Sequence, residues 1–191
     1  MQRRAELVDE TRQRITEAAV RLHTSVGPSA TSMAAVADEA GVTRLTLYRH
    51  FATRDDLFAA CMSHWRAAHR PPDPDTWRTV TPFEKRVEVA VGDVYAWYDA
   101  NGDDLYPIYR DLAFTPDATI RARRANTDRM VDALLEGSGV RGSARRRLRA
   151  AAGHVLAFWT WRSLRVDEGL SPDEARAVAT SFLFGARPSG R

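Results

Sequence analysis

The sequence of 191 residues lacks features that several classes of protein require. Its single cysteine, Cys61, excludes an intramolecular disulfide and is too little for a zinc finger or a zinc ribbon. No apolar run approaches the roughly 18 residues that a membrane-spanning helix needs. The first residues, MQRRAELVDETRQR, are charged where a signal peptide would be apolar. We therefore expect a cytoplasmic protein, and we expect no metal ion and no cofactor.

Lysine is nearly absent as well, because Lys85 is the only lysine among 28 basic residues. We attribute this preference to a GC-rich genome, so the sequence pI of about 9.4 is on its own weak evidence for a nucleic-acid partner. The charge is unevenly distributed. Residues 1–54 carry 8 basic and 6 acidic side chains, residues 55–120 carry 6 and 12, and residues 121–191 carry 14 and 7. The middle of the chain is therefore acidic and both ends are basic.

Catalytic motifs are missing too. The sequence contains no GxSxG elbow, no P-loop and no HExxH motif, and its five histidines are dispersed. A helical enzyme, and a helical adaptor that does not bind DNA, remain alternative functions at this point. An aspartate cluster could attract a cation, but no ordered ligand spacing links its members, so we interpret it as solvated. The cluster consists of Asp99, Asp103, Asp104 and Asp111. We interpret the arginine runs at 121–124 and 145–149 as solvated faces in preference to further DNA contacts.

Alternating strand patterns are also absent, and nearly every periodic segment has apolar residues three or four positions apart. We therefore predict an all-α fold. Helices are expected at about residues 11–25, 32–40, 43–50, 53–70 and 81–101, in a shorter segment at 105–114, from 115 to the glycine-rich stretch at 136–142, at 143–167, and from 171 onward.

The predicted helix boundaries depend on capping residues and prolines. Three pairs have the spacing of a capping box, in which a hydroxyl and a carboxylate cap each other's backbone N–H groups: Thr53 with Asp56, Thr81 with Glu84, and Ser171 with Glu174. Three prolines between residues 70 and 76 forbid helix continuation and mark a break between two parts of the fold. The inward stripe of the first helix is expected to be Ile15, Ala18, Ala19, Leu22 and Val26.

The strongest functional signal lies in a short helix, a tight turn and a second short helix. The first helix follows Ser32, the turn contains Gly41, and the second helix follows Thr43. This is the helix-turn-helix arrangement, whose second helix lies in the DNA major groove. If Leu47 and Phe51 point into the core, a 100° step per residue places the other side chains of the second helix on the opposite face.

These side chains divide into two expected roles. Arginine pairs with guanine O6 and N7 through two hydrogen bonds, and threonine or leucine methyl groups can meet a thymine methyl. We expect four residues to face bases: Arg44, Leu45, Thr46 and Arg49. Hydroxyl, imidazole and guanidinium groups, and capped helix starts, suit phosphate oxygens. We expect five residues to hold phosphates: Ser32, Thr43, Tyr48, His50 and Arg54.

The segment TSMAAVADEAGVTRLTLYRHFATRDDLF resembles the DNA-binding signature of the TetR family of bacterial transcriptional regulators, and the resemblance is specific over about residues 8–60. Two positions depart from the pattern. Arg54 stands where many members have lysine, which keeps the charge, and Leu45 stands where many have glycine or a small residue, which leaves the base preference open.

The resemblance implies a helix-turn-helix DNA-binding domain at residues 1–54 and a larger effector-binding and dimerisation domain at 55–191, joined by a connecting helix at about 54–70. It implies a homodimer that binds a palindromic operator. The family more commonly represses transcription, and activation by the same fold remains an alternative. Effector binding would tilt the connecting helix and spread the two DNA-reading helices of the dimer.

Aromatic residues are concentrated beyond Phe58, where 14 of the 17 lie. Together with the resemblance, this concentration implies a small-molecule pocket, although aromatic residues at helical spacing often form only a core. The candidate pocket residues are Trp65, Tyr95, Trp97, Tyr98, Tyr106, Tyr109, Phe114, His154 and Phe158. Residues 150–161 are apolar nearly all round and must be covered on more than one side. We therefore expect dimerisation through the last two helices.

Overall fold

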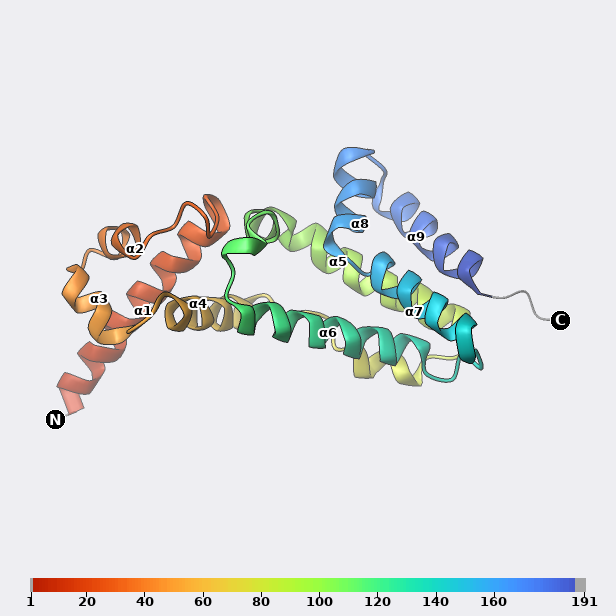
Figure 1. The fold of residues 1–191 in the computed structure, drawn as a ribbon, viewed down its shortest axis with the longest axis horizontal. Helices are drawn as coiled ribbons and strands as arrows, with labels where there is room; N and C mark the ends of the chain where they lie inside the picture. Colours follow the sequence, from red (N-terminus) through yellow and green to blue (C-terminus); the bar gives the residue numbers. More distant parts are fainter. Residues whose placement is uncertain (1, 188–191) are drawn as a thin grey trace. The chain divides into compact units, whose positions relative to one another are not determined.

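The computed structural model describes residues 2–187, and all the regular structure within them is helical (Figure 1). The predicted all-α fold is confirmed. The chain forms two compact units. Unit 1 contains the residues up to Arg70 together with Asp103–Arg121, and unit 2 contains Pro71–Gly102 and the residues from Ala122 onward. No helix in the described part of the chain is both long and apolar enough to cross a membrane.

Unit 1 contains four complete α-helices. These are α1 (Gln2–Ser25), α2 (Met33–Glu39), α3 (Arg44–His50) and α4 (Arg54–Ala68). The end of α5 (Phe83–Arg110), the short 3-10 helix η2 (Leu112–Phe114) and the start of α6 (Asp117–Leu135) complete the unit. Helix α1 packs against α2 and α4, and α2 packs against α3. The core of α1–α4 consists of Ile15, Ala18, Ala19, Val36, Ala37, Leu47, Phe51, Leu57 and Cys61.

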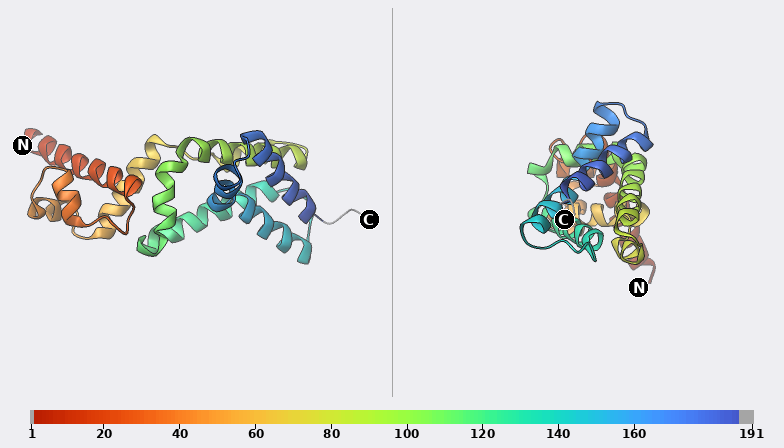
Figure 2. Two further views of the ribbon diagram at one scale, coloured as in Figure 1. Left: turned by 90° about the horizontal axis from the view of Figure 1, so that it is seen from above. Right: turned by 90° about the vertical axis from the view of Figure 1, so that its right-hand side faces the viewer.

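Unit 2 contains the 3-10 helix η1 (Pro74–Thr79), the first part of α5 and most of α6. It also contains α7 (Gly142–Val155), α8 (Phe158–Arg162), the π-helical segment η3 (Ser163–Asp167) and α9 (Pro172–Ala186). Helices α7 and α9 lie side by side (Figure 2).

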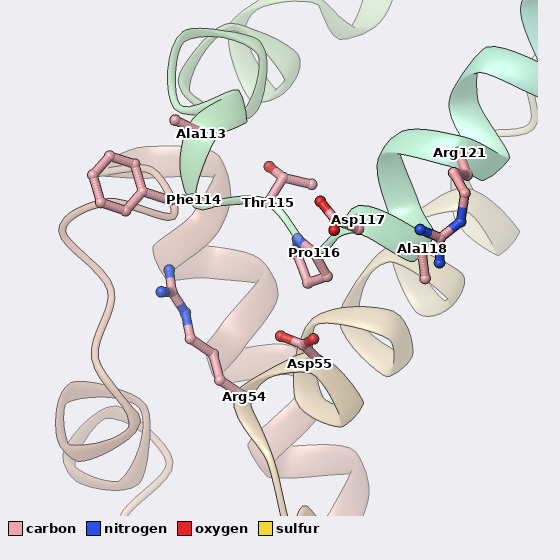
Figure 3. Close-up of a pocket in the computed structure, with 9 residues that line it drawn as sticks. All are labelled: Arg54, Asp55, Ala113, Phe114, Thr115, Pro116, Asp117, Ala118 and Arg121. Carbon is pink, nitrogen blue, oxygen red and sulfur yellow. The ribbon is translucent and has the colours of Figure 1, made fainter.

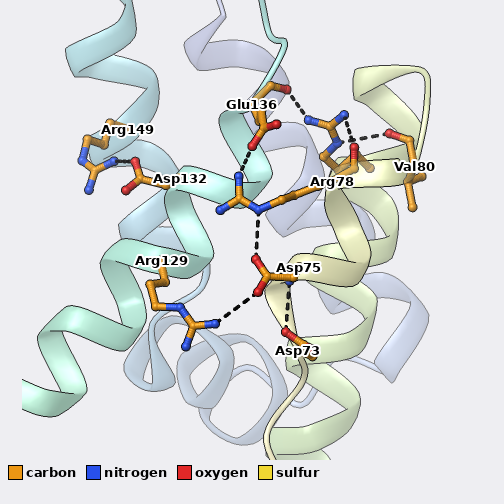
Figure 4. Close-up of polar contacts among 9 residues, drawn as sticks. Asp73, Asp75, Arg78, Val80, Arg129, Asp132, Glu136 and Arg149 are labelled. Atoms are coloured by element: carbon orange, nitrogen blue, oxygen red, sulfur yellow. Dashed lines mark hydrogen bonds and ion pairs between the residues drawn. The ribbon is translucent and has the colours of Figure 1, made fainter.

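Polar contacts tie η1 to α6 within unit 2 (Figure 4). The Arg78 guanidinium pairs with Glu136 and, at 2.9 Å, with Asp75, whose carboxylate also lies 3.5 Å from Arg129. Because these side chains are largely exposed, each pair contributes little to stability. Arg86 is 6% exposed, and its guanidinium donates to the carbonyls of Val80, Arg78 and Glu136.

Two of the three predicted capping boxes form. At the start of α4, Thr53 and Asp56 cap each other's backbone N–H groups, and Ser171 and Glu174 do the same at α9. The third prediction was wrong. Helix α5 begins at Phe83, and its first backbone bond runs from Arg86 N to Pro82 O, so Thr81 lies outside the helix.

Helix α5 does not end at the Asn-Gly pair as predicted, but continues to Arg110 with Pro107 inside it. The predicted separate segment at 105–114 is therefore its last turns followed by η2. Gly102 is buried, and a Cβ atom there would lie 2.2 Å from Cη2 of Trp161. Glycine stands in this helix because the indole occupies the space of a side chain, and not because the chain turns.

The single helix predicted at 143–167 was also wrong, because the chain breaks between α7 and α8, where Ala157 is extended. A break exposes carbonyl groups that a continuous helix would have bonded. The Tyr95 and Tyr98 hydroxyls donate to the carbonyls of Val155 and Leu156 at 3.1 and 3.2 Å. The Thr160 hydroxyl donates to the His154 carbonyl at 2.5 Å. These three side chains stabilise the break.

The first helix ends at Ser25 as predicted, but its start and the burial of Val26 differ from the prediction. Helix α1 begins at Gln2 and not near Thr11, so it is nine residues longer than predicted. Val26 was placed in its inward stripe but is 47% exposed, because the helix ends at Ser25 and the chain turns away at Gly27.

Candidate nucleic-acid interface

Helix α3 has two turns, and it buries one side in the core while the other side is exposed. Leu47 is fully buried, and Phe51, which follows the helix, is also buried. Leu45 and Tyr48 are 64% and 50% exposed, and Arg44 and Arg49 are exposed with them. The predicted outward direction of these side chains is thus observed, while their contact with DNA remains a prediction.

Side-chain caps fix the starts of both helices of the motif. The Ser32 hydroxyl accepts a hydrogen bond from Ala35 N, and the Thr43 hydroxyl accepts one from Thr46 N, both at 3.1 Å. The hydroxyls of Thr43 and Thr46 lie 2.9 Å apart and hydrogen-bond to each other. Gly41, with a φ of 64°, makes the turn between α2 and α3. Because a backbone in this left-handed region strains any residue with a Cβ atom, glycine suits this position.

A contact that the sequence did not suggest fixes the other end of α3. The Arg12 guanidinium on α1 donates to the His50 carbonyl at 2.7 Å and lies 4.2 Å from the centre of the Phe51 ring. It thereby binds one of the carbonyls that the end of a helix leaves unpaired. No sequence pattern links Arg12 to a carbonyl group 38 residues further on, so this contact could not be predicted from the sequence.

Arg54 was predicted to hold a phosphate, but its guanidinium is partly occupied. Its Nη2 donates to the Pro28 carbonyl at 2.5 Å, so a phosphate would have to bind the remaining N–H groups. Arg54 also lies at the edge of a hollow of about 470 Å³ between the start of α4 and the start of α6 (Figure 3). The hollow is polar, since Asp55, Asp117 and Arg121 also line it.

A neutral histidine and a thiol lie in the core behind the motif. His23 Nδ1 lies 3.3 Å from Cys61 Sγ, and the imidazole packs against the Phe58 ring. Burial, and then the charge of Arg54, lower the pKa of His23 to about 4, while burial raises the pKa of the Cys61 thiol to about 12. At neutral pH an uncharged imidazole and a protonated thiol therefore share a hydrogen bond, and Cys61 is a core residue.

Comparison with known proteins agrees with this geometry. The family model for bacterial regulatory proteins of the tetR family matches residues 15–61. Over 50 residues the chain is 48% identical to the HTH-type transcriptional regulator AcrR of Shigella flexneri. Residues 15–61 are thus similar to the DNA-binding region of TetR-family regulators. The match with AcrR covers 26% of this chain and 23% of AcrR.

Solved TetR structures extend the likeness in fold over nearly the whole chain. A TetR-like regulator from Rhodococcus sp. RHA1 has a TM-score of 0.62 at 20% identity, over 91% of this chain and 93% of that one. A TetR regulator from Haloarcula marismortui has a TM-score of 0.58 at 17% identity, over 93% and 98%. NalD of Pseudomonas aeruginosa has a TM-score of 0.54 at 21% identity, over 93% and 96%. The TetR fold thus includes both compact units.

The candidate pocket residues have varied surroundings. In unit 1, the Trp65 indole donates to Asp104 at 2.8 Å, and Phe114, which is 52% exposed, lines the hollow in Figure 3. Tyr106 and Tyr109 are half-buried in the same unit.

In unit 2, the hydroxyls of Tyr95 and Tyr98 are engaged at the break after α7, and Phe158 lies 5.5 Å from Tyr98 between ring centres. Trp97 is half-buried and His154 is exposed. Whether these residues bind an effector remains a prediction. No group of three or more His, Cys, Asp or Glu side chains in the described residues could hold a metal ion.

Proposed function

We propose that this protein is a transcriptional regulator that binds a palindromic operator as a homodimer and releases it when a small molecule binds. The observation that carries the proposal is the exposed face of α3. Two guanidinium groups, a phenol and an aliphatic side chain project from a helix whose opposite side is anchored in the core. Exposed guanidinium and hydroxyl groups on an anchored helix suit an anionic partner such as DNA.

The proposed DNA contacts follow the chemistry of each group. Arg44 and Arg49 would bind guanine edges, and Leu45 and the Thr46 methyl would contact thymine methyl groups. The remaining donors would bind phosphates and set the register of the helix in the groove. These are the hydroxyls of Ser32, Thr43 and Tyr48, the His50 imidazole, and the N–H groups of Arg54 that do not bind Pro28.

A homodimer through the last two helices is supported by exposed apolar side chains in unit 2. Trp159 on α8, Val166 on η3 and Phe182 on α9 are 45%, 49% and 54% exposed. The three segments are neighbours, because η3 packs against both α8 and α9, and exposed apolar side chains on neighbouring segments are a feature of protein interfaces. A two-fold dimer would also match a palindromic operator, because each subunit reads one half-site.

Repression is the proposed outcome because NalD, which shares the fold, is described as the secondary repressor of the MexAB-OprM multidrug efflux pump. We assign DNA reading to residues 1–54 and effector binding and dimerisation to residues 55–191, with a connecting helix at about 54–70. The site of action would be the cytoplasm, where bacterial operators lie. The effector pocket would use some of the nine candidate residues named above.

The test is a mobility-shift titration on the DNA upstream of the gene, at several salt concentrations. Wild-type protein is expected to bind specifically and more weakly as salt rises, because bound phosphates release counterions. Arg44→Ala is expected to cost about 1–3 kcal/mol of specific binding and to leave the oligomeric state unchanged. Arg66→Ala, which removes an exposed arginine from α4, is the matched control for loss of one charge. Equal losses in the two variants would contradict the placement of α3 in the groove.

A further inference from the structure

The loop between α1 and α2 sets where the helix-turn-helix begins. It leaves α1 at Val26 and reaches Ser32, the N-cap of α2, six residues later. Within the loop, the Thr31 hydroxyl donates to the Gly27 carbonyl at 2.8 Å. From α4, Arg54 donates to the Pro28 carbonyl at 2.5 Å. Since α2 packs directly on α3, the position of this loop determines the position of the DNA-reading helix.

A residue far away in the sequence holds the loop most firmly. Asp111 follows the last residue of α5, and its side chain is only 8% exposed. Its carboxylate accepts hydrogen bonds from Ser29 N at 3.0 Å and from the Ser29 hydroxyl at 2.5 Å. It also accepts from Arg110 Nε and Nη2 at 2.8 and 3.1 Å. Four donors saturate the acceptor capacity of a carboxylate, so Asp111 is committed to this contact.

Arg110 extends the contact to a second point of the loop. Its Nη2 donates to the Val26 carbonyl at 2.8 Å, next to the end of α1. The Arg110 guanidinium beside Asp111 holds the pKa of that carboxyl well below its usual range, so the pair stays charged across the physiological pH range. Arg110 and Asp111 therefore bind the loop at Val26 and at Ser29 as one charged unit.

Gly27 shows how closely the loop approaches this pair. Its φ is 94°, and a Cβ atom there would lie 2.4 Å from Asp111 Oδ2 and 2.6 Å from Arg110 Nη2. A side chain at this position would displace both groups, and the backbone conformation would also be strained. Glycine at position 27 therefore leaves the space that the Asp111 carboxylate and the Arg110 guanidinium occupy.

We propose that Asp111 is a positioning residue for operator recognition: by holding the α1–α2 loop through Ser29, it sets the position of α2 and of the DNA-reading face of α3. This inference rests on the proposed function. It adds that the DNA-reading head is completed from outside residues 15–61, the segment that the family model covers. The head depends on the end of α5, so a rearrangement of that end would change DNA binding without touching α3.

The test compares two variants that raise the net charge by the same amount. Asp111→Asn keeps the shape of the side chain but removes the charge and one of the two acceptor oxygens, so the amide cannot accept from the Ser29 and Arg110 donors together. Asp103→Asn, at an exposed residue of α5, is the matched control. Affinity for the operator is measured by fluorescence anisotropy at a temperature where circular dichroism shows all proteins folded. Hydrogen exchange of residues 26–50 is measured on the free proteins.

We expect Asp111→Asn to weaken operator binding about tenfold or more, since the reading face is displaced, while Asp103→Asn binds at least as tightly as wild type because it removes a repulsive charge. Exchange is expected to become faster in the α1–α2 loop and in α2. Ser29→Ala, which keeps the backbone N–H donor, should give a smaller loss of the same kind. A role confined to stability would lower the melting temperature and leave the affinity of the folded protein unchanged, and that result would overturn the inference.

Failure of the proposed function gives a different result. If wild-type protein binds no operator fragment, the regulator function is overturned, and the exchange data alone decide whether Asp111 holds the loop. Faster exchange confined to residues 26–50 in Asp111→Asn would then support the positioning role, and unchanged exchange would overturn it.

Discussion

The buried histidine behind the helix-turn-helix gives a stability that depends on pH. His23 is 2% exposed and has a pKa of about 4, whereas an unfolded histidine has a pKa of about 6.5. Between these values the unfolded state binds a proton that the folded state does not, so the free energy of unfolding falls as the pH falls. The variant His23→Gln removes the titrating group and keeps a polar side chain that can hydrogen-bond to Cys61.

The magnitude follows from the two pKa values. A separation of about 2.5 pKa units corresponds to about 3 kcal/mol of unfolding free energy once the pH is below both values. Most of this change occurs between pH 6.5 and pH 4, and the interval from pH 7 to pH 5 contains about 2 kcal/mol of it. Other groups titrate in the same range, so the prediction concerns the difference between wild type and variant.

The assay is urea unfolding of wild type, His23→Gln and His64→Gln at pH 7 and pH 5, followed by circular dichroism. His64 is exposed on α4 and serves as the control for losing a histidine. Wild type and His64→Gln should lose about 2 kcal/mol more than His23→Gln on acidification. If all three proteins lose the same stability, His23 titrates normally in the folded state and the described burial of its imidazole is refuted.

Three further predictions concern unit 2. Gly102→Ala should lower the free energy of unfolding by about 1–3 kcal/mol, because its methyl group would overlap the Trp161 ring; an unchanged melting temperature would show that α5 and the indole are not in contact. Tyr98→Phe should cost about 1–2 kcal/mol, because it leaves the Leu156 carbonyl at the helix break without its donor, and thermal unfolding measures this loss. Phe182→Asp should convert the dimer into a monomer in size-exclusion chromatography with light scattering, since a charge would enter the proposed interface; a dimer that persists would place the interface elsewhere.

The helix-turn-helix could be predicted from sequence because its determinants are local. The caps at Ser32 and Thr43, the turn glycine Gly41 and the anchors Leu47 and Phe51 lie within 20 residues of one another. Each acts through neighbours three or four positions away, which is the distance over which sequence patterns carry information. The outward face of α3 follows from these residues alone.

Two of the errors have the opposite origin, since each depends on a residue distant in the sequence. An Asn-Gly pair normally ends a helix, but Gly102 continues α5 because the Trp161 ring fills the space beside it. An apolar stretch normally continues a helix, but the chain breaks at Ala157 because Tyr95 and Tyr98 bind the freed carbonyls. Neither partner could be recognised before the tertiary structure was known.

Two contacts that support the candidate nucleic-acid interface also could not be predicted from the sequence, because their partners are far apart in the chain. Arg12 binds the end of α3 and Asp111 binds the α1–α2 loop, yet one lies 38 residues before the carbonyl it binds and the other 82 residues after its serine partner. Both are ordinary charged residues in the sequence. The TetR resemblance does not identify them either, because the segment that carries it, residues 31–58, contains neither residue.

The proposed function requires that α3 reads a two-fold symmetric DNA sequence. It is tested most directly by selecting bound duplexes from a random DNA pool with the wild-type protein, which requires no knowledge of the natural operator. We expect an enriched palindrome whose half-sites are about one helical turn or more apart, and we expect the preference at one position of each half-site to relax when Arg44→Ala is used. A pool that shows no enriched sequence after selection would contradict the claim.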